Sequence, residues 1–583
     1  MPKQRGLSFS LGCFLAAAAP YALAQTAVER NLPPVPVPSA APIVTPDVVP
    51  ASQDATPLGV NLRAIVLLGV KDSAYSDASV PNGVHQTKVP MLDRPETRFA
   101  LTPFIGRPLS RKLIAEIQAE IARQSRAVER PFVSMSTPEQ EITGGVLQIR
   151  VTEFKAGKVG ASGVEGPAAE TVTRGIRLQP GQSIHSGVLS EDLDWLNRNP
   201  FRQVSALFSP ASAEFETDVA IKAELQRPYR VFAGWANSGS ESTGLGRTFV
   251  GGVATVPGLR DAYVSYQLTG SNDFWKEGSS YFNSEPRYVA QGVRLYIPTL
   301  PRQNIELTLS DAKTNQVVNA DFSVRQRTSE ATLGYRMALS TFGLPAGSGD
   351  VLVAIEAKRQ HRQVFFGGEN ALDLSADAWQ MMGGWSKGWQ GNGSQALAAV
   401  NLHVSPGGVS DRSSSERIAE LTNGRVTSDK YSYLTIDLSG AKRLNNGMAI
   451  TTQLSGQIAA KVLPLSAQIG LGGEGLVRGY SADDGSFDSG IVSRTELRLP
   501  AMSLVKFGGE ARDQFAPFIF LDAGHGRDRS LKVNATLMAA GAGADYTFGK
   551  NLSVGLNAAR ALRDGQTTQS GEWRVQARAT VTF

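Results

Sequence analysis

Arg478 is the residue best placed to do chemistry in this sequence, because it is a cation set in a tight, glycine-rich turn. It belongs to the tetrapeptide Val477-Arg478-Gly479-Tyr480. About forty residues later, the segment Phe520-Leu521-Asp522-Ala523-Gly524 carries a carboxylate in an otherwise apolar run. The fork of an arginine matches a carboxylate through two parallel hydrogen bonds. Arg478 and Asp522 are therefore candidates for a specific ion pair.

The face of the strand that carries Asp522 follows from residue parity. Phe520, Asp522 and Gly524 share one face of a strand, while Leu521 lies on the other. In a membrane barrel a charge on the lipid face costs about 2 to 4 kcal/mol at the midplane, so Asp522 is expected to face the lumen. Glu496, on the preceding strand, is a second candidate partner for Arg478. The alternative is that Arg478 is a solvated arginine in an ordinary surface loop.

Other patterns with chemical meaning do not assemble into a catalytic site. Gly470-x-Gly472-x-x-Gly475 has the spelling of a dinucleotide fingerprint, but Val477-Arg478-Gly479-Tyr480 rather than a helix follows it. The five histidines are scattered without metal-ligand spacing. His525 is near Asp522 in sequence, but no G-x-S-x-G serine turn accompanies it, and we interpret it as a loop histidine. We predict no enzyme, no cofactor and no metal site.

The region that carries this site alternates between apolar and polar residues from Tyr229 to Phe583. In the last segment, Trp573, Val575, Ala577, Ala579, Val581 and Phe583 share a face opposite Arg574, Gln576, Arg578, Thr580 and Thr582. Such a strand suits a barrel in lipid, where only a closed sheet satisfies every backbone donor and acceptor. At about 22 residues per strand and connection, the region predicts about 16 strands. A soluble β-sandwich is the alternative.

Two mixed modules precede the predicted barrel. In the first we expect a strand over residues 61–68, a helix capped by Ser110, and strands over 131–135 and 146–153. In the second we expect strands over 158–164, 203–209 and 218–225, with a helix over 190–198 after the first of them. A polar insertion, about 71–98, interrupts the first module. The order in both modules is strand, helix, strand, strand.

The amino terminus and the composition set the compartment. Lys3 and Arg5 precede an apolar run and the small-residue site Ala22-Leu23-Ala24, which predicts a signal peptide over 1–24. Residues 25–57 are rich in proline and predict an extended linker. Cys13 is the sole cysteine, so disulfides and thiolate metal sites are not expected in the exported chain. A formal net charge of +5 with no basic run gives no reason to expect nucleic acid.

Several of these blocks resemble one known family. Val477-Arg478-Gly479-Tyr480 with F-x-D-x-G resembles the signature of the Omp85 superfamily. The amino-terminal modules resemble the POTRA domains of its two-partner secretion transporters, the TpsB proteins of the ShlB/FhaC/HecB haemolysin secretion/activation type. The blocks that carry this second resemblance are Phe104-Ile105-Gly106-Arg107-Pro108-Leu109-Ser110, Pro138-Glu139-Gln140-Glu141-Ile142, Gly145-Val146-Leu147 and Trp195-Leu196-Asn197-Arg198-Asn199-Pro200-Phe201-Arg202.

The resemblance implies a mostly β protein, with a 16-stranded transmembrane barrel over 228–583 preceded by two periplasmic α/β POTRA domains over 58–155 and 156–227. It also implies that the loop arginine pairs with the aspartate on the barrel wall. Phe583 resembles the terminal signal for insertion by the barrel assembly machinery. The family often has an amino-terminal plug helix, which the proline-rich linker disfavours here.

The expected function is that of a translocator in the bacterial cell outer membrane. It would export a large, unfolded TpsA-type exoprotein from the periplasm to the cell surface without nucleotide hydrolysis. Outer-membrane lipid and periplasmic chaperones would be its other partners. The alternative is an Omp85-type barrel assembly factor, an insertase, although such proteins tend to have three or five POTRA domains. A plain diffusion porin would leave the amino-terminal modules without a role.

Overall fold

The computed structural model describes residues 32–33, 43, 52–76, 79–275, 282–391, 393–507 and 510–583. The predicted signal peptide and most of the predicted linker lie outside these residues. The chain divides into two compact units, one of residues 38–226 and one of residues 1–37 with 227–583. None of the helices in the described residues has the length and apolar character needed to span a membrane.

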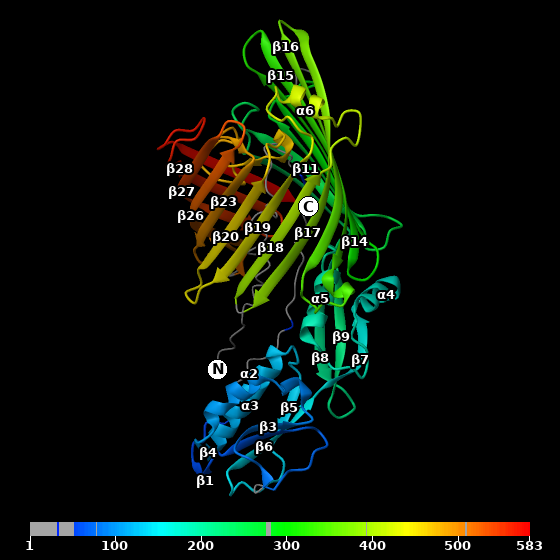
Figure 1. Ribbon diagram of the computed structural model, residues 1–583, viewed down its shortest axis with the longest axis vertical. Helices are drawn as coiled ribbons and strands as arrows, with labels where there is room; N and C mark the ends of the chain where they lie inside the picture. Colours follow the sequence, from blue (N-terminus) through cyan, green and yellow to red (C-terminus); the bar gives the residue numbers. More distant parts are fainter. Residues whose placement is uncertain are drawn as a thin grey trace. The chain divides into compact units, whose positions relative to one another are not determined.

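The larger unit is a closed antiparallel barrel of sixteen strands in the described residues, in which each strand pairs with its neighbours in the chain and the last closes on the first (Figure 1). The predicted strand number is confirmed. The strands are β10 (Tyr229–Ala236), β11 (Arg247–Thr255), β12 (Tyr263–Ser271), β13 (Tyr288–Pro298), β14 (Gln303–Val317), β15 (Phe322–Ala338), β16 (Asp350–Phe366), β17 (Glu369–Gly391), β18 (Ser394–Ser405), β19 (Tyr431–Arg443), β20 (Ala449–Ala459), β23 (Ser489–Arg498), β26 (Asp513–Asp528), β27 (Val533–Phe548), β28 (Leu552–Ala561) and β29 (Trp573–Thr582).

Alternation along the strands separates the lumen from the outer surface. On β26, Phe518, Phe520 and Asp522 are buried, whereas Ile519 and Leu521 are about half exposed. An exposed apolar row opposite a buried row that carries a charge is the pattern of a strand with lipid on its outer face. We call the end of the barrel where β10 begins the entry end, and the opposite end the far end.

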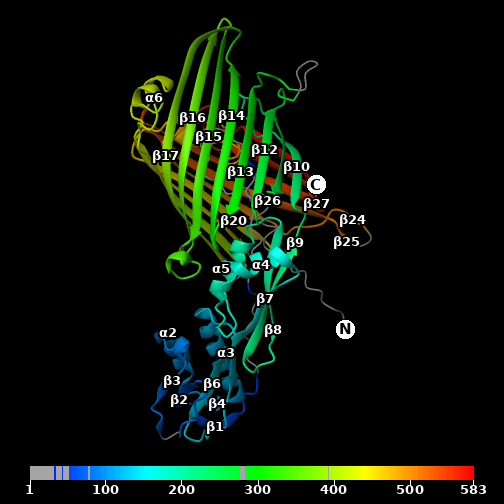
Figure 2. The same cartoon turned by 90° about the vertical axis from the view of Figure 1, so that its right-hand side faces the viewer.

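The long connections at the far end carry the remaining small elements of the barrel unit. The loop of residues 406–430 contains α6 (Ser415–Leu421), which packs on β17 (Figures 1 and 2). The loop of residues 460–488 joins β20 to β23 and contains η5 (Leu465–Ala467), β21 (Ile469–Gly470) and β22 (Ser486–Phe487). At the entry end, η4 (Leu339–Phe342), β24 (Lys506–Phe507) and β25 (Glu510–Ala511) lie in turns.

The first amino-terminal module is a four-stranded sheet in the order β3-β2-β6-β5, covered by a helix. Its apolar core joins the helix to β2 and β6 through residues such as Ile65, Ile117 and Leu147. The Ser110 side chain accepts a hydrogen bond from the backbone N–H of Leu113, so the predicted helix cap is confirmed. The elements are β1 (Pro57–Asn61), β2 (Ala64–Leu68), β3 (Gly83–Thr87), η2 (Pro90–Leu92), α2 (Pro95–Leu101), η3 (Thr102–Phe104), β4 (Pro108–Ser110), α3 (Arg111–Ala127), β5 (Val133–Ser136) and β6 (Val146–Glu153).

The second module has a three-stranded sheet in the order β7-β9-β8 with two helices. Its own core includes Val172, Leu189, Val204 and Ile221. The elements are β7 (Lys155–Ser162), α4 (Gly166–Gly175), α5 (Ser186–Leu196), β8 (Arg202–Pro210) and β9 (Glu216–Leu225). The domain limits given above remain predictions.

Three expectations for the modules need correction. The single strand expected over 61–68 is two strands, β1 and β2, because β1 pairs with β4 instead of joining the main sheet. The insertion supplies the strand β3, which pairs in parallel with β2, and the helix α2. The helix α4 was missed because Gly166 and Pro167 open it and Val172 is its one buried residue.

Candidate functional site

The loop of residues 460–488 folds back into the barrel and packs on the inner wall. Its apolar residues, among them Leu471, Val477 and Tyr480, form one cluster with residues of β23, β27 and β28. Apolar burial therefore holds the loop against the strands, and the loop presents Arg478 to the wall inside the lumen.

Two glycines of the predicted motifs allow the loop to approach the wall closely. Gly479 has a φ of +90°, and a Cβ atom there would lie 3.1 Å from the Cβ of Ala559. A Cβ atom on Gly524 would lie 2.9 Å from a methyl group of Val477. A side chain at either position would push the loop off the wall. Each motif therefore needs its glycine for the packing of the loop on the wall: Gly479 on the side of the loop and Gly524 on the side of the wall.

Arg478 binds both oxygens of the Asp522 carboxylate through the Nε–Nη2 edge of its guanidinium. Its Nε donates to Asp522 Oδ2 at 2.7 Å and its Nη2 donates to Asp522 Oδ1 at 2.9 Å. The backbone N–H of Arg478 also donates to Asp522 Oδ2, at 3.2 Å. Both side chains are almost completely buried, at 2% and 0% exposed. A buried, bidentate pair of this kind is specific in geometry as well as in charge.

Glu496 binds Arg478 at the same time, so the two candidate carboxylates are joint partners and not alternatives. Arg478 Nη1 donates to Glu496 Oε1 at 2.7 Å. The other oxygen of Glu496 accepts a hydrogen bond from Arg498 Nη1 at 2.6 Å. Arg498 also pairs with Asp545 on β27. The buried cations thus alternate with carboxylates, which keeps each charge compensated.

Two phenylalanines form an aromatic floor under these arginines. The guanidinium carbon of Arg478 lies 3.6 Å from the centre of the Phe520 ring. That of Arg498 lies 4.8 Å from the centre of the Phe518 ring. Both rings face the lumen from β26, two residues apart. The electron-rich face of an aromatic ring attracts a cation.

Arg494, Arg498 and Asp545 are site residues that we did not predict from the sequence. Arg494 lies opposite Asp522 in the strand ladder, and its Nη1 donates to the carbonyl oxygen of Gly475 in the loop at 3.1 Å. Parity was the available signal, because Arg494 and Arg498 share the face of Glu496 on β23. Asp545 carried the same signal, because a charge within an alternating strand of a barrel is expected on the lumenal face.

Tyr480 fixes the loop at a second point. Its hydroxyl group lies 2.8 Å from the carbonyl oxygens of Met538 and Arg563 and accepts hydrogen bonds from the backbone N–H groups of both residues at 3.2 Å. Met538 is on β27 and Arg563 follows β28. One phenol thus joins the loop to the backbone of β27 and to the residues that directly follow β28.

Phe583 lies at the seam between the first and last strands. Its N–H donates to the carbonyl oxygen of Val231 at 2.8 Å, and its carbonyl oxygen accepts from Val231 N–H at 3.3 Å. The ring is 70% exposed on the outside of the barrel. The backbone of Phe583 therefore helps to close the barrel, while its ring stays accessible.

The block around Asn197 is structural in the second module. The amide of Asn197 donates to the carbonyl oxygen of Val204 at 3.0 Å and accepts from its N–H at 2.6 Å. Asn199 accepts a hydrogen bond from Phe201 N–H at 2.9 Å, and Arg202 donates to the carbonyl oxygen of Leu196 at 2.8 Å. The block thus shapes the turn from α5 into β8.

A short part of the predicted linker is inside the barrel. Pro33 is buried, and its carbonyl oxygen accepts a hydrogen bond from Arg294 Nε on β13 at 3.0 Å. On the same strand, a Cβ atom added to Gly292 would lie 2.9 Å from Pro33 and 3.0 Å from Leu32, so these two residues pack closely on β13. The position of a plug helix falls on residues outside those that the structure describes.

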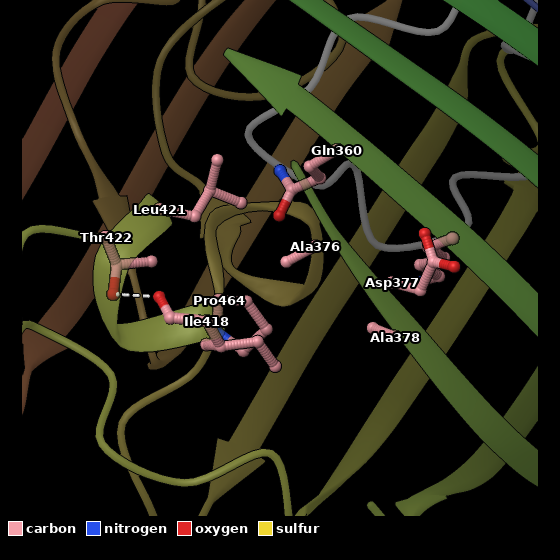
Figure 3. Close-up of a pocket in the computed structure, with 9 residues that line it drawn as sticks. Gln360, Ala376, Asp377, Ala378, Ile418, Leu421, Thr422 and Pro464 are labelled. Atoms are coloured by element: carbon pink, nitrogen blue, oxygen red, sulfur yellow. Dashed lines mark hydrogen bonds between the residues drawn. The ribbon is translucent and has the colours of Figure 1, made fainter. Parts of the chain in front are cut away.

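The remaining candidates do not form a site with Arg478. His525 is on β26 and not in a loop as expected; it faces outward, and its Nδ1 lies 2.8 Å from Thr536 Oγ1. No group of three or more potential metal ligands occurs in the described residues. The pocket in Figure 3, where Thr422 Oγ1 donates to the carbonyl oxygen of Ile418 in α6, is lined by neither Arg478 nor its carboxylate partners.

Comparisons with known proteins agree with this architecture. A family model of the haemolysin secretion/activation protein ShlB/FhaC/HecB matches residues 349–547. The outer membrane transporter CdiB of Dickeya dadantii is 22% identical over 425 residues, which cover 68% of this chain and 67% of that protein.

Two solved structures share the fold over nearly the whole chain. CdiB from Escherichia coli superposes with a TM-score of 0.65 at 17% identity and covers 94% of each chain. CdiB from Acinetobacter baumannii has a TM-score of 0.58 at 14% identity and covers 98% of this chain and 96% of its own. The family resemblance found in the sequence is confirmed.

Proposed function

We propose that this chain, a two-partner secretion transporter of the ShlB/FhaC/HecB type in the Omp85 superfamily, exports one large exoprotein of the TpsA class across the bacterial outer membrane. The observation that carries the proposal is the loop of residues 460–488, which is held inside the barrel lumen by the buried pair of Arg478 and Asp522. The outer membrane is the location of the barrel, and the amino-terminal modules are periplasmic.

The modules would recognise the exoprotein in an unfolded form. An extended chain can add a strand to an exposed sheet edge through main-chain hydrogen bonds, without precise side-chain contacts. In the second module, Asn197 already occupies the outward backbone groups of Val204 on the terminal strand β8. A partner strand would therefore pair with β8 beyond Val204. In the first module, β3 already covers the edge of β2.

The barrel would then conduct the exoprotein past the anchored loop. The site contains paired cations and carboxylates on an aromatic floor, an arrangement suited to holding a loop in one place. Folding of the exoprotein outside the cell would supply the driving force, so export would need no nucleotide hydrolysis and no catalysis. We propose that periplasmic chaperones deliver the exoprotein and that the barrel assembly machinery inserts the transporter itself through Phe583.

The test is to delete residues 60–226 and to measure the partner exoprotein in the medium. We expect the truncated protein to form a heat-modifiable barrel in the outer membrane and to export nothing. Undiminished secretion would refute recognition by the modules. In a second arm the whole gene is removed: a general loss of unrelated outer-membrane barrels would identify an assembly factor, whereas the transporter predicts that these barrels keep normal levels.

A further inference from the structure

The seam where the barrel closes is its shortest strand pairing. β10 pairs with β29 through five residue pairs, from Phe232 with Thr582 to Ala236 with Arg578, while every other neighbouring pair in the barrel aligns eight or more. At the entry end the reciprocal bonds of Val231 and Phe583 extend it. Toward the far end, the side chain of Asn237 takes over the pairing with β29. Its amide donates to the carbonyl oxygen of Val575 and accepts a hydrogen bond from Ala577 N–H. The seam has the fewest ladder hydrogen bonds to resist separation.

Two far-end loops flank this seam. Residues 237–246 follow β10, and residues 562–572 lead into β29. The loop that carries Arg478 reaches both of them through two consecutive residues, Asp483 and Asp484. Asp484 binds the loop before β29, and Asp483 binds the loop after β10.

Asp484 is completely buried and accepts five hydrogen bonds. Its Oδ1 accepts from Thr567 N–H at 2.7 Å, from Thr567 Oγ1 at 3.0 Å and from Thr568 N–H at 2.9 Å. Its Oδ2 accepts from Thr568 Oγ1 at 2.5 Å and from Ser481 N–H at 2.7 Å. A Cβ atom on Gly565 would lie 2.4 Å from this carboxylate, so the loop closes tightly around it. Such charge-assisted bonds are the stronger class.

Asp483 reaches the other side of the seam. Its Oδ1 accepts a hydrogen bond from Ser242 Oγ at 3.1 Å, and Ser242 N–H donates to its Oδ2 at 3.4 Å. The loop that carries Ser242 is held in place by a buried arginine. Arg247 is 1% exposed, and its Nη2 donates to Oγ1 of Thr243, the residue after Ser242, at 2.7 Å. The guanidinium carbon of Arg247 also lies 4.1 Å from the centre of the Tyr288 ring.

We propose that Asp483 and Asp484 form a clasp that holds the barrel seam closed from the lumen side. Arg478 anchors the same loop five residues before Asp483. One short segment therefore connects the lumenal ion pair to the loops on both sides of the seam. The clasp does not depend on the proposed export function, since it concerns how the barrel holds itself shut. A displacement of the loop would release both seam loops together.

The test is amide hydrogen exchange on the purified full-length protein in membrane mimetic. We compare Asp484→Ala with Asp429→Ala, a matched control, because Asp429 is also a buried carboxylate that binds loop groups, Gly408 N–H and Ser415 Oγ, both at 2.8 Å, away from the seam. Loss of a buried charged acceptor should raise exchange of the seam amides of β10 and β29 by about tenfold or more in Asp484→Ala. Asp429→Ala should leave seam exchange unchanged.

Two outcomes would overturn the clasp. Seam exchange that stays slow in Asp484→Ala, with a change confined to residues 562–572, would show that Asp484 caps only its own loop. Equal acceleration of the seam in Asp429→Ala would show general loosening. The milder Asp484→Asn serves if the alanine variant fails to fold, and it should accelerate the seam in the same direction.

A rescue experiment separates seam opening from other defects. Ala236 and Arg578 face each other across the seam, and the predicted mature chain has no cysteine. Ala236→Cys with Arg578→Cys should form a disulfide in the Asp484→Ala background, because directly opposed residues place their Cβ atoms within reach. Seam exchange should then return to the slow rate when oxidised and rise again on reduction. Fast exchange in the oxidised protein would contradict the clasp.

Discussion

Arg478 stacks on the ring of Phe520 and binds the carboxylate of Asp522, two residues that a single strand presents on the same face. The guanidinium carbon is 3.6 Å from the ring centre, and Nε is 2.7 Å from Asp522 Oδ2. Alternation along β26 places residues two apart side by side in the lumen. The F-x-D-x-G pattern therefore supplies a charge and an aromatic support for one arginine, and its glycine makes room for the loop.

The first prediction concerns the buried ion pair. Arg478→Ala and Asp522→Ala should each reduce secretion of the exoprotein, normalised to barrel abundance, by about tenfold or more. Each removes the bidentate partner of a buried charge, and breaking a buried pair in this way costs up to about 3 to 5 kcal/mol. The double variant should lose less than the two singles combined, since it leaves no unpaired partner at this position. The exchanged variant, Arg478→Asp with Asp522→Arg, should recover only partly, because the fork starts from a different stem.

The same series distinguishes the roles of the two carboxylates. Glu496→Gln should cost less than Asp522→Ala, because Asp522 makes three hydrogen bonds to Arg478 and Glu496 makes one. Strictly additive single and double defects would show that Arg478 and Asp522 do not act together. A larger defect for Glu496→Gln would instead assign the main role to Glu496.

The second prediction tests the aromatic floor. Phe520→Leu keeps an apolar side chain but removes the ring under Arg478, which should weaken the loop anchor by about 0.5 to 2 kcal/mol. We expect barrel abundance to stay normal and protease cleavage within residues 471–480 to become faster. Phe366→Leu, at an exposed hairpin tip, is the matched control and should change neither. Unchanged cleavage in Phe520→Leu would show that the carboxylates hold the loop alone.

The third prediction concerns Phe583. Phe583→Ser keeps the backbone bonds to Val231 and removes the exposed ring, so the folded barrel should remain active once formed. Its amount in the outer membrane should fall several-fold, because slow or incomplete insertion exposes the chain to proteases. Heat-modifiable protein and secretion per barrel are the two measurements. Normal abundance with lost secretion would contradict the assignment of Phe583 to insertion.

The fourth prediction is the pH dependence of the loop that binds Asp484. Burial raises the pKa of this carboxyl, but hydrogen bonds from Thr568, Thr567 and Ser481 outweigh burial and hold the pKa below its ordinary value of 3.8. A carboxyl with a depressed pKa in the folded state stabilises that state above its unfolded pKa and loses this contribution as the pH falls through the folded pKa.

Protease cleavage in residues 562–572 should therefore stay slow from neutral pH down to about pH 4 and accelerate only in stronger acid. Asp484→Asn should be cleaved faster at neutral pH, without that acid step. A step between pH 5 and 7 in the unaltered protein would indicate a different titrating group.

The barrel and the identity of the anchoring residues could be predicted from the sequence because both depend on local patterns. Alternation repeats at every second residue, so it shows which face of β26 and β29 meets lipid without knowledge of the partner strands. The same parity placed Phe520 and Asp522 inside. Ser110 was recognisable as a helix cap, since its bond partner is only three residues away.

The tertiary structure alone decided which of these groups meet. Asp484 and Thr568 are 84 residues apart, and no periodicity relates them. Whether Arg478 took Asp522 or Glu496 also depended on the path of the loop, and the answer was both. The parallel pairing of β3 with β2 arose from an insertion that looked merely polar. Side-chain facing follows from a two-residue repeat, whereas contacts across a lumen follow from how sixteen strands close and where a long loop finds apolar surface.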